Sequence, residues 1–319
     1  MMKKLFILWI LISYFSYAEQ RLAPVQKIII EGTAKDIVVD ERHVYIGTDK
    51  GKLEVYDYQE KKFIKEISLP MIQDFMGDSV SPRVFSVDVL ENRYLLLSES
   101  GKGGYANLWI HEHNTTKQLI FPEDKKTLVK ARFVDKNHIL LGYLGNEAAL
   151  YEIDTNKERY HVQLSESKFS DFALDEKKQY AAYGCESGMI SVINVSDGSL
   201  VKVLKGVNLD NTYKVDFKQG IVSAAGQDRR GAFYDVATGE GDYIEGSFLI
   251  YATGLSPSAK KVAFAMDEQN NITVFNRTSK AKTAVLEGQK STLNAIVFKD
   301  EEVLFSASDD NTVLMWKLN

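Results

Sequence analysis

The chain has few of the residues that metal, thiol or disulfide chemistry requires. Its 319 residues include one cysteine, Cys185, and five histidines. A single cysteine excludes an intramolecular disulfide and any CxxC metal or redox motif. The formal net charge is −5, so the basic excess that is typical of nucleic-acid binding is also absent. With 45% hydrophobic residues the chain can still bury a sizeable core, and we expect neither a cofactor nor a metal.

Long apolar runs are absent except at the N-terminus. Lys3 and Lys4 precede the apolar run 5–15 (LFILWILISYF), and residues 16–18 (SYA) have the small-x-small pattern that signal peptidase accepts. The run is too short for a membrane span, which needs about 20 residues. The sequence therefore predicts a cleaved signal peptide at 1–18, a mature chain 19–319 without a membrane anchor, and a periplasmic location.

Internal repetition is the strongest signal in the remaining chain. Strand-like segments end in an aromatic or large apolar residue, with separations of 53, 42, 42, 41, 41 and 41 residues. The seven positions are Tyr56, Trp109, Tyr151, Ile193, Tyr234, Phe275 and Trp316. This period is typical of four-stranded propeller blades, and no helical periodicity is sustained after residue 18. The sequence predicts an all-β, seven-bladed β-propeller over 19–319.

A second repeat predicts how the ring closes. The outer strands of several copies end in similar four-residue strings at 203–206 (VLKG), 243–246 (YIEG) and 285–288 (VLEG). The same pattern occurs at 29–32 (IIEG), where no full copy precedes it, while the last copy ends at Asn319 without an outer strand. We expect residues 25–30 to supply the missing strand of the last blade.

One stretch carries a family resemblance. Residues 306–316 (SASDDNTVLMW) resemble the end of a WD40 repeat, although the histidine that the family places after glycine is replaced at 207, 247 and 289. The resemblance covers about residues 25–319 and implies a degenerate WD40-like propeller. It also implies at most a partial form of the family's Ser-His-Asp-Trp hydrogen-bond network. The candidates for that network are Ser306, Asp309 or Asp310, and Trp316.

No catalytic motif is complete. The string 184–188 (GCESG) misplaces the serine of a hydrolase elbow, and 101–104 (GKGG) lacks the spacing of a phosphate-binding loop. His111 and His113 are two residues apart but have no third ligand nearby. Carboxylates that recur at blade positions leave one enzymatic alternative open, a propeller hydrolase or lactonase with a metal in the central channel. They are Glu99, Asp171, Asp216 and Asp267.

Two features predict surfaces for a protein partner. The long interval before Trp109 places extra residues at 71–82 (MIQDFMGDSVSP), where Met71, Phe75 and Met76 suit docking to another protein. The alternative is that these residues fold back onto their own blade. Residues near the start of each inner strand should share one face of the ring. Arg132 is an unusual charge expected to line the channel or pair with a neighbouring blade. The expected face contains Lys35, Arg83, Phe85, Lys130, Asp171, Tyr213, Lys214, Tyr251 and Asn294.

Residues 112–116 (EHNTT) match an acidic-x-Asn-x-Thr glycosylation sequon and make Asn114 a modification candidate.

The functional expectation follows from these patterns together with a second resemblance. As a whole, the chain is similar to accessory proteins of periplasmic nitrate reductase operons, which implies a supporting role without catalysis. We expect a monomeric, non-enzymatic interaction platform, with an envelope-assembly scaffold for another client as an alternative.

Overall fold

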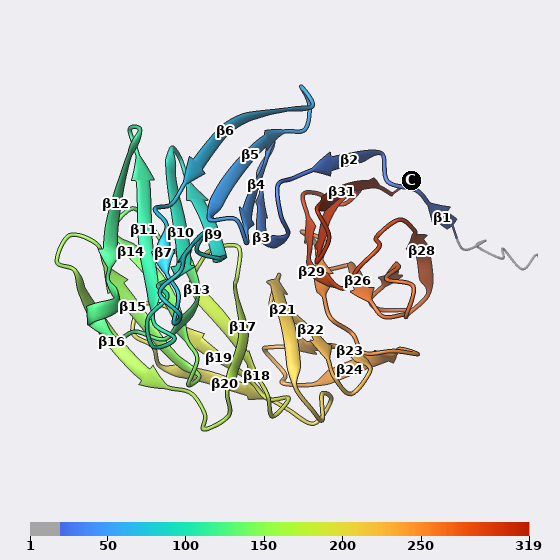
Figure 1. Cartoon of the computed structure of the whole chain (residues 1–319). Coiled ribbons are helices and arrows are strands. Elements are labelled where there is room, and N and C mark those ends of the chain that lie inside the picture. The colour runs from blue at the N-terminus through green and yellow to red at the C-terminus, as the bar shows by residue number, and fades with distance from the viewer. Residues whose placement is uncertain (1–19, 319) are drawn as a thin grey trace, which may run out of the picture.

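The computed structural model describes residues 20–318 and shows seven small sheets arranged in a ring (Figure 1). Apart from a single 3-10 turn at Pro122–Asp124, the regular elements are all strands. The predicted all-β, seven-bladed propeller is therefore confirmed. The predicted signal peptide at 1–18 lies outside the described residues.

Each blade is a four-stranded antiparallel meander, and we number the blades in chain order. Blade 1 is β3 (Ala34–Val39), β4 (His43–Thr48), β5 (Lys52–Asp57) and β6 (Lys62–Ser68); blade 2 is β9 (Val84–Leu90), β10 (Arg93–Glu99), β11 (Ala106–Glu112) and β12 (Thr115–Ile120). Blade 3 is β13 (Leu128–Phe133), β14 (His138–Tyr143), β15 (Glu147–Glu152) and β16 (Lys157–Gln163); blade 4 is β17 (Phe169–Leu174), β18 (Tyr180–Cys185), β19 (Ile190–Asn194) and β20 (Leu200–Leu204).

The last three blades follow the same order. Blade 5 is β21 (Thr212–Lys218), β22 (Ile221–Gly226), β23 (Arg230–Asp235) and β24 (Gly241–Glu245); blade 6 is β25 (Thr253–Leu255), β26 (Lys261–Ala265), β27 (Ile272–Asn276) and β28 (Lys282–Leu286). Blade 7 is β29 (Leu293–Phe298), β30 (Val303–Ser308), β31 (Thr312–Lys317) and the N-terminal strand β2 (Gln26–Ile29). All seven repeat positions lie on the third strand of their blades.

The ring closes as the repeat pattern predicts. Strand β2 pairs antiparallel with β31, with Ile28 opposite Val313. The pairing is extended by backbone hydrogen bonds from Val25 to Met315 and from Ile30 to Asn311. One further strand has no counterpart in the prediction: β1 (Gln20–Leu22) adds in parallel to β28 as a fifth strand of blade 6. The N-terminal segment thus holds two adjacent blades together.

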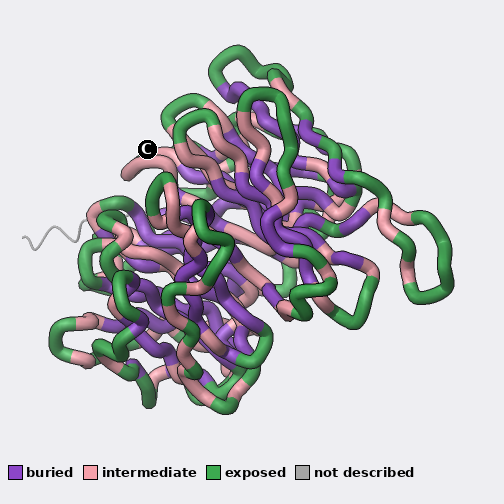
Figure 2. Tube along the Cα trace, turned by 90° about the vertical axis from the view of Figure 1, so that its left-hand side faces the viewer, coloured by how far each residue is buried: buried purple, intermediate pink, exposed green. Residues whose placement is uncertain are grey.

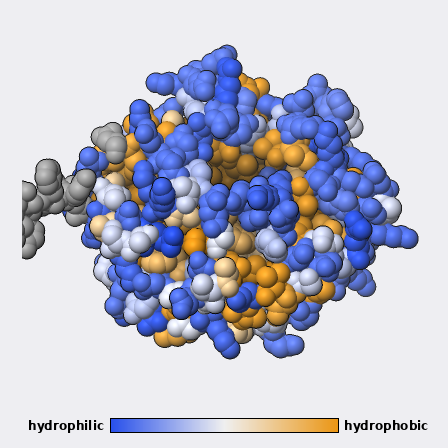
Figure 3. Space-filling model, turned by 180° about the vertical axis from the view of Figure 1, so that it is seen from behind, coloured by the Kyte–Doolittle hydropathy of each residue, from blue (hydrophilic) through white to orange (hydrophobic). Residues whose placement is uncertain are grey.

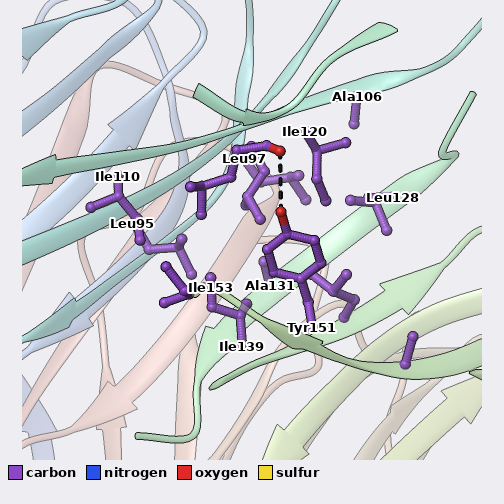
Figure 4. Close-up of a cluster of buried hydrophobic side chains, with 14 of the residues drawn as sticks. Leu95, Leu97, Ala106, Ile110, Ile120, Leu128, Ala131, Ile139, Tyr151 and Ile153 are labelled. Atoms are coloured by element: carbon purple, nitrogen blue, oxygen red, sulfur yellow. Dashed lines mark hydrogen bonds between the residues drawn. The ribbon is translucent and has the colours of Figure 1, made fainter. Parts of the chain in front are cut away.

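The hydrophobic core lies mainly between blades, because both faces of each sheet pack against a neighbour. Burial is concentrated in the strands and exposure in the turns (Figure 2). Between blades 2 and 3, Leu95, Leu97 and Ile139 pack around Tyr151, whose hydroxyl donates a hydrogen bond to the Leu119 carbonyl at 3.2 Å (Figure 4). The large residue at each repeat position therefore fills the space between neighbouring sheets. Cys185 is also buried, as its place in an alternating strand predicts.

Blade 7 contains a hydrogen-bond network similar to the one that the WD40 resemblance implies. Trp316 Nε1 donates to Ser306 Oγ at 2.8 Å, and Gln289 Nε2 donates to the same oxygen at 2.7 Å. Gln289 Oε1 accepts from Ser308 at 3.1 Å. Gln289 thus occupies the place of the missing histidine. The predicted participation of Asp309 or Asp310 is wrong, because Asp310 caps the turn at Thr312 and Asp309 binds Lys35 and Asn294.

Candidate functional site

The inner strands of the seven blades surround a central channel. From behind, the ring is hollowed at its centre, with apolar side chains around the hollow (Figure 3). A cavity of about 380 Å³ follows this channel and is lined by residues of all seven inner strands, including Asp36, Asp88, Arg132, Asp171 and Lys214. The channel is a candidate catalytic or binding site, because charged side chains from distant parts of the chain meet there.

Four channel carboxylates have a shared structural role. Each accepts a hydrogen bond from a backbone N–H on the inner strand of the following blade. Asp36 accepts from Val87 at 2.9 Å, Asp88 from Phe133 at 2.7 Å, Asp171 from Val215 at 3.1 Å and Asp216 from Leu255 at 2.8 Å. These bonds join consecutive blades. Two of the four carboxylates that the sequence left open for metal binding or hydrolysis, Asp171 and Asp216, take part in them.

Basic residues neutralise two of these carboxylates. Arg132 lines the channel, as expected, and forms an ion pair with Asp36 at 2.8 Å. Its ionic partner lies on blade 1, two blades away, whereas its contact with the neighbouring blade 2 is a hydrogen bond to Ser86. Lys130 Nζ lies 2.6 Å from Asp171 Oδ1. No acidic side chain lies within 4.0 Å of Lys214 Nζ among residues 20–318. Lys214 is thus an unpaired cation beside the channel.

Burial and charge act in opposite directions on the central ion pair. Burial lowers the pKa of the Lys130 ammonium, and the Asp171 carboxylate opposes that effect. Burial by itself would raise the pKa of Asp171, but the charges of Lys130 and Lys214 hold it below the ordinary value. The two lysines therefore favour the ionised form of Asp171, as in a structural ion pair.

The structure gathers most of the predicted face at one mouth of the channel. A cavity of about 420 Å³ opens there, with Leu128 and Leu144 in its apolar wall. The predicted residues that line it are Lys35, Arg83, Phe85, Lys130, Asp171 and Lys214. Asp171 lies at this face as expected, but its side chain is buried and bonded to Lys130 and to the Val215 N–H.

The remaining predicted residues lie outside this cavity. Tyr213 and Tyr251 stack on each other with ring centroids 5.2 Å apart. Asn294 donates hydrogen bonds to the Ala34 carbonyl and to Asp309, so it joins blade 7 to blade 1. Sequence reasoning missed three further residues that line the channel. Asp88 and Lys218 lie further along their inner strands than the residues expected to be displayed, and Lys178 lies in the turn between β17 and β18.

The extra residues at 71–82 form a small hairpin. Strands β7 (Ile72–Gln73) and β8 (Ser79–Val80) pair antiparallel, and β7 is drawn beside β10 of blade 2 (Figure 1). The base packs on its own blade: Gly101 has a φ of +74° and approaches the Gln73 carbonyl so closely that a Cβ there would lie 2.0 Å from the oxygen. The tip does not fold back, since Asp74 caps the turn through the N–H groups of Met76 and Asp78.

The apolar side chains of this hairpin differ in exposure. Phe75 is 90% exposed, Met76 71% and Met71 56%, whereas Ile72 is half-buried. Folding back onto the blade therefore applies to Ile72 and not to the three proposed anchors. Docking of those anchors to a partner stays a prediction.

The other sequence candidates have ordinary structural surroundings. Glu99 forms an ion pair with Arg83 at 3.0 Å, and Asp267 caps a turn through the N–H groups of Gln269 and Asn271. His111 contacts Thr116, while His113 lies in an exposed turn. Asn114 is in the same turn and is exposed.

Neither a metal centre nor a membrane helix is found in the part of the chain that the structure describes. Across residues 20–318, no three His, Cys, Asp or Glu side chains come together in a way that could hold a metal ion. Nor do these residues form a helix with the length and apolar character needed to cross a bilayer. In comparisons with known proteins, no protein-family model matches the chain, and no curated protein matches it significantly.

Proposed function

We propose that this chain is a non-enzymatic, periplasmic interaction platform whose client is the periplasmic nitrate reductase system. The client assignment rests on the overall likeness of the sequence to the accessory protein NapL. The proposed role is support of maturation or activity of the reductase, without catalysis by this chain.

The observation that carries the proposal is the exposed apolar surface of the hairpin at 71–82. Phe75 and Met76 at the tip and Met71 at the base are each more than half exposed. Such apolar surface lowers solubility unless another surface covers it, and flexible Met side chains adapt well to such a surface. The rigid base on blade 2 fixes the position of the tip, which reduces the entropy that binding would cost.

The channel mouth supplies a second contact region. Its apolar wall around Phe85 and Leu144 is rimmed by Lys35, Arg83 and Lys214. An apolar centre with a polar and basic rim is the ordinary anatomy of a protein interface. The channel carboxylates are already bonded to neighbouring blades, so the mouth is better suited to recognition than to acid–base chemistry.

The proposal is tested by direct binding between the purified chain and the purified periplasmic nitrate reductase. Replacing Met71, Phe75 and Met76 with serine should weaken binding substantially, since truncating interface anchors costs about 1–4 kcal/mol each. The thermal midpoint should change little, because these side chains contact mainly water.

A matched control replaces Phe63 and Ile64, two exposed apolar residues on β6, with serine. This control should bind the reductase like the intact chain. If the intact chain does not bind the reductase at all, the client assignment fails, and recovery of another envelope protein would favour the scaffold alternative. If the triple variant binds normally, the hairpin is not the docking site.

A further inference from the structure

We propose that the outer edge of blade 4, strand β20, receives an extended segment of a partner protein that carries an acidic residue followed by an apolar one. The segment would pair with β20 as a fifth strand. This inference is independent of the proposed function, because β20 lies two blades away from the hairpin at 71–82 (Figure 1).

Blade 6 already has a fifth strand on its outer edge. On blade 6, strand β1 pairs in parallel with the outer strand β28, with Gln20, Arg21 and Leu22 opposite Ala284, Val285 and Leu286. The outer edge of a blade in this protein can therefore accept a fifth strand. Its unpaired backbone groups form the template for that addition.

The two edges have the same geometry. Leu204 pairs with Ile190 in blade 4 as Leu286 pairs with Ile272 in blade 6. The pairing then shifts register at equivalent places, between Val192 and Ile193 in blade 4 and between Val274 and Phe275 in blade 6. The strings at the strand ends, 203–206 (VLKG) and 285–288 (VLEG), match in the same register. A strand placed on β20 as β1 lies on β28 would cover residues 202–204.

The second argument is the apolar character of this edge. Leu200 is 57% exposed, Val201 44% and Val203 38%, so three of the five residues of β20 present apolar surface to solvent. The charge in the middle of the strand does not shield them, because Lys202 turns toward blade 5 and donates to the Ala237 carbonyl at 3.2 Å. Strand β6 has exposed Phe63 and Ile64 too, but charged residues with partners surround them.

The third argument is charge complementarity, and it specifies the occupant. At the end of β28, Glu287 forms an ion pair with Arg21 of the added strand, and its N–H donates to the Leu22 carbonyl at 2.9 Å. The equivalent residue in blade 4 is Lys205, which is exposed and has no acidic side chain within 4.0 Å among residues 20–318. A strand for β20 therefore needs an acidic residue where β1 has Arg21, with an apolar residue after it.

The same charges disfavour a second copy of this chain as the occupant. Residues 20–22 of another copy would place Arg21 beside Lys205. The sequence of β20 (LVKVL) reads the same in both directions, so antiparallel pairing of two β20 strands centred on Lys202 would put lysine opposite lysine. Like charges directly opposite each other destabilise a strand pair.

The experiment uses a seven-residue peptide with the sequence of residues 19–25, in which Arg21→Glu supplies the acidic residue. Amide hydrogen exchange of the purified chain is followed with this peptide and with the unchanged Arg21 peptide. We expect slower exchange at residues 200–205 with the Glu peptide. Residues 282–287, which β1 already covers, should not change.

Two variants test the charge assignment. In Lys205→Glu the preference should reverse in favour of the Arg21 peptide, with affinities changing by about twofold to fivefold, as expected for a cross-strand charge pair. The matched control Lys117→Glu, an exposed lysine on the outer strand β12, should leave the preference for the Glu peptide unchanged.

Three outcomes would overturn the proposal. The first is unchanged exchange at residues 200–205 with the Glu peptide at about 5 mM, well above the dissociation constant of even a weak strand addition. The second is equal protection by both peptides in the intact chain and in Lys205→Glu. The third is a dimer in sedimentation experiments that Val203→Asp abolishes, which would show that a second copy occupies the edge.

Discussion

Arg132 of blade 3 and Asp36 of blade 1 form an ion pair at 2.8 Å across blade 2, although 95 residues separate them in the chain. Arg132 also donates to Ser86 Oγ of the intervening blade, and Asp36 accepts from the Val87 N–H. Three consecutive blades are therefore tied together by one arginine and one aspartate, both largely buried.

Removing only the arginine should be costly. We expect Arg132→Met to destabilise the fold by about 3–5 kcal/mol, because Asp36 would be left buried without its counter-ion. The double variant Arg132→Met with Asp36→Asn should regain much of this loss, since asparagine still accepts the Val87 N–H without carrying a charge. Chemical denaturation of the three proteins measures the difference. A double variant no more stable than Arg132→Met would show that burial of an unpaired charge is not the cause.

The N-terminal strand should be essential for a closed ring. Deleting residues 28–31 removes two of the four residues of β2 and the hydrogen bond from Ile30 to Asn311, which exposes part of the edge of β31. We expect a large fall in the thermal midpoint or aggregation. Ile29→Thr is the matched control, since Ile29 is largely exposed and its replacement keeps the backbone pairing. A shortened chain that melts like the intact one would contradict closure by β2.

The glutamine in the blade 7 network should be required for stability. Gln289→Leu would remove the acceptor of the buried Ser308 hydroxyl and one of the two donors to Ser306, at a cost of about 1–3 kcal/mol. Thermal melts should show the loss, while Gln269→Leu in an exposed turn should be close to neutral. Gln289→His should retain much of the stability, because an imidazole can also donate to Ser306. Equal melting of Gln289→Leu and Gln269→Leu would remove any role for the network.

Glu54 should make stability depend on pH. Burial raises the pKa of its carboxyl, with the nearby Glu66 acting in the same direction, and its Oε2 is buried without a hydrogen-bond partner. A pKa raised by folding means that the ionised form is penalised in the folded state. Stability from the neutral carboxyl is therefore fully present below the unfolded-state pKa and is lost as the pH rises through the folded-state pKa.

Glu54→Gln removes this ionisation. We expect the variant to be more stable than the intact chain near pH 8, and the advantage to shrink as the pH falls toward about 4. Thermal midpoints across this pH range check the prediction, with exposed Glu268→Gln as the control. A difference between Glu54→Gln and the intact chain that does not vary with pH would refute the titration of Glu54.

Much of the site could be anticipated from strand position alone. Inner strands of a propeller begin at the same mouth of the channel, so residues such as Lys35, Arg83 and Lys214 were predicted to share a face, and they line one cavity. Their pairing could not be predicted in the same way. Whether Asp171 faces solvent or Lys130 depends on how neighbouring blades are rotated relative to each other. The repeat pattern in the sequence does not specify that rotation.

The sequence by itself determined the all-β fold, the number of blades and the closing strand, because each blade repeats one period and local alternation decides which residues are buried. Only the tertiary structure decided which charges meet in the channel, which residues of the hairpin at 71–82 are exposed, and that residues 20–22 add to blade 6. These contacts join segments far apart in the chain, and their geometry depends on how seven sheets pack around one axis. Periodicity cannot encode that packing, since it describes each blade separately.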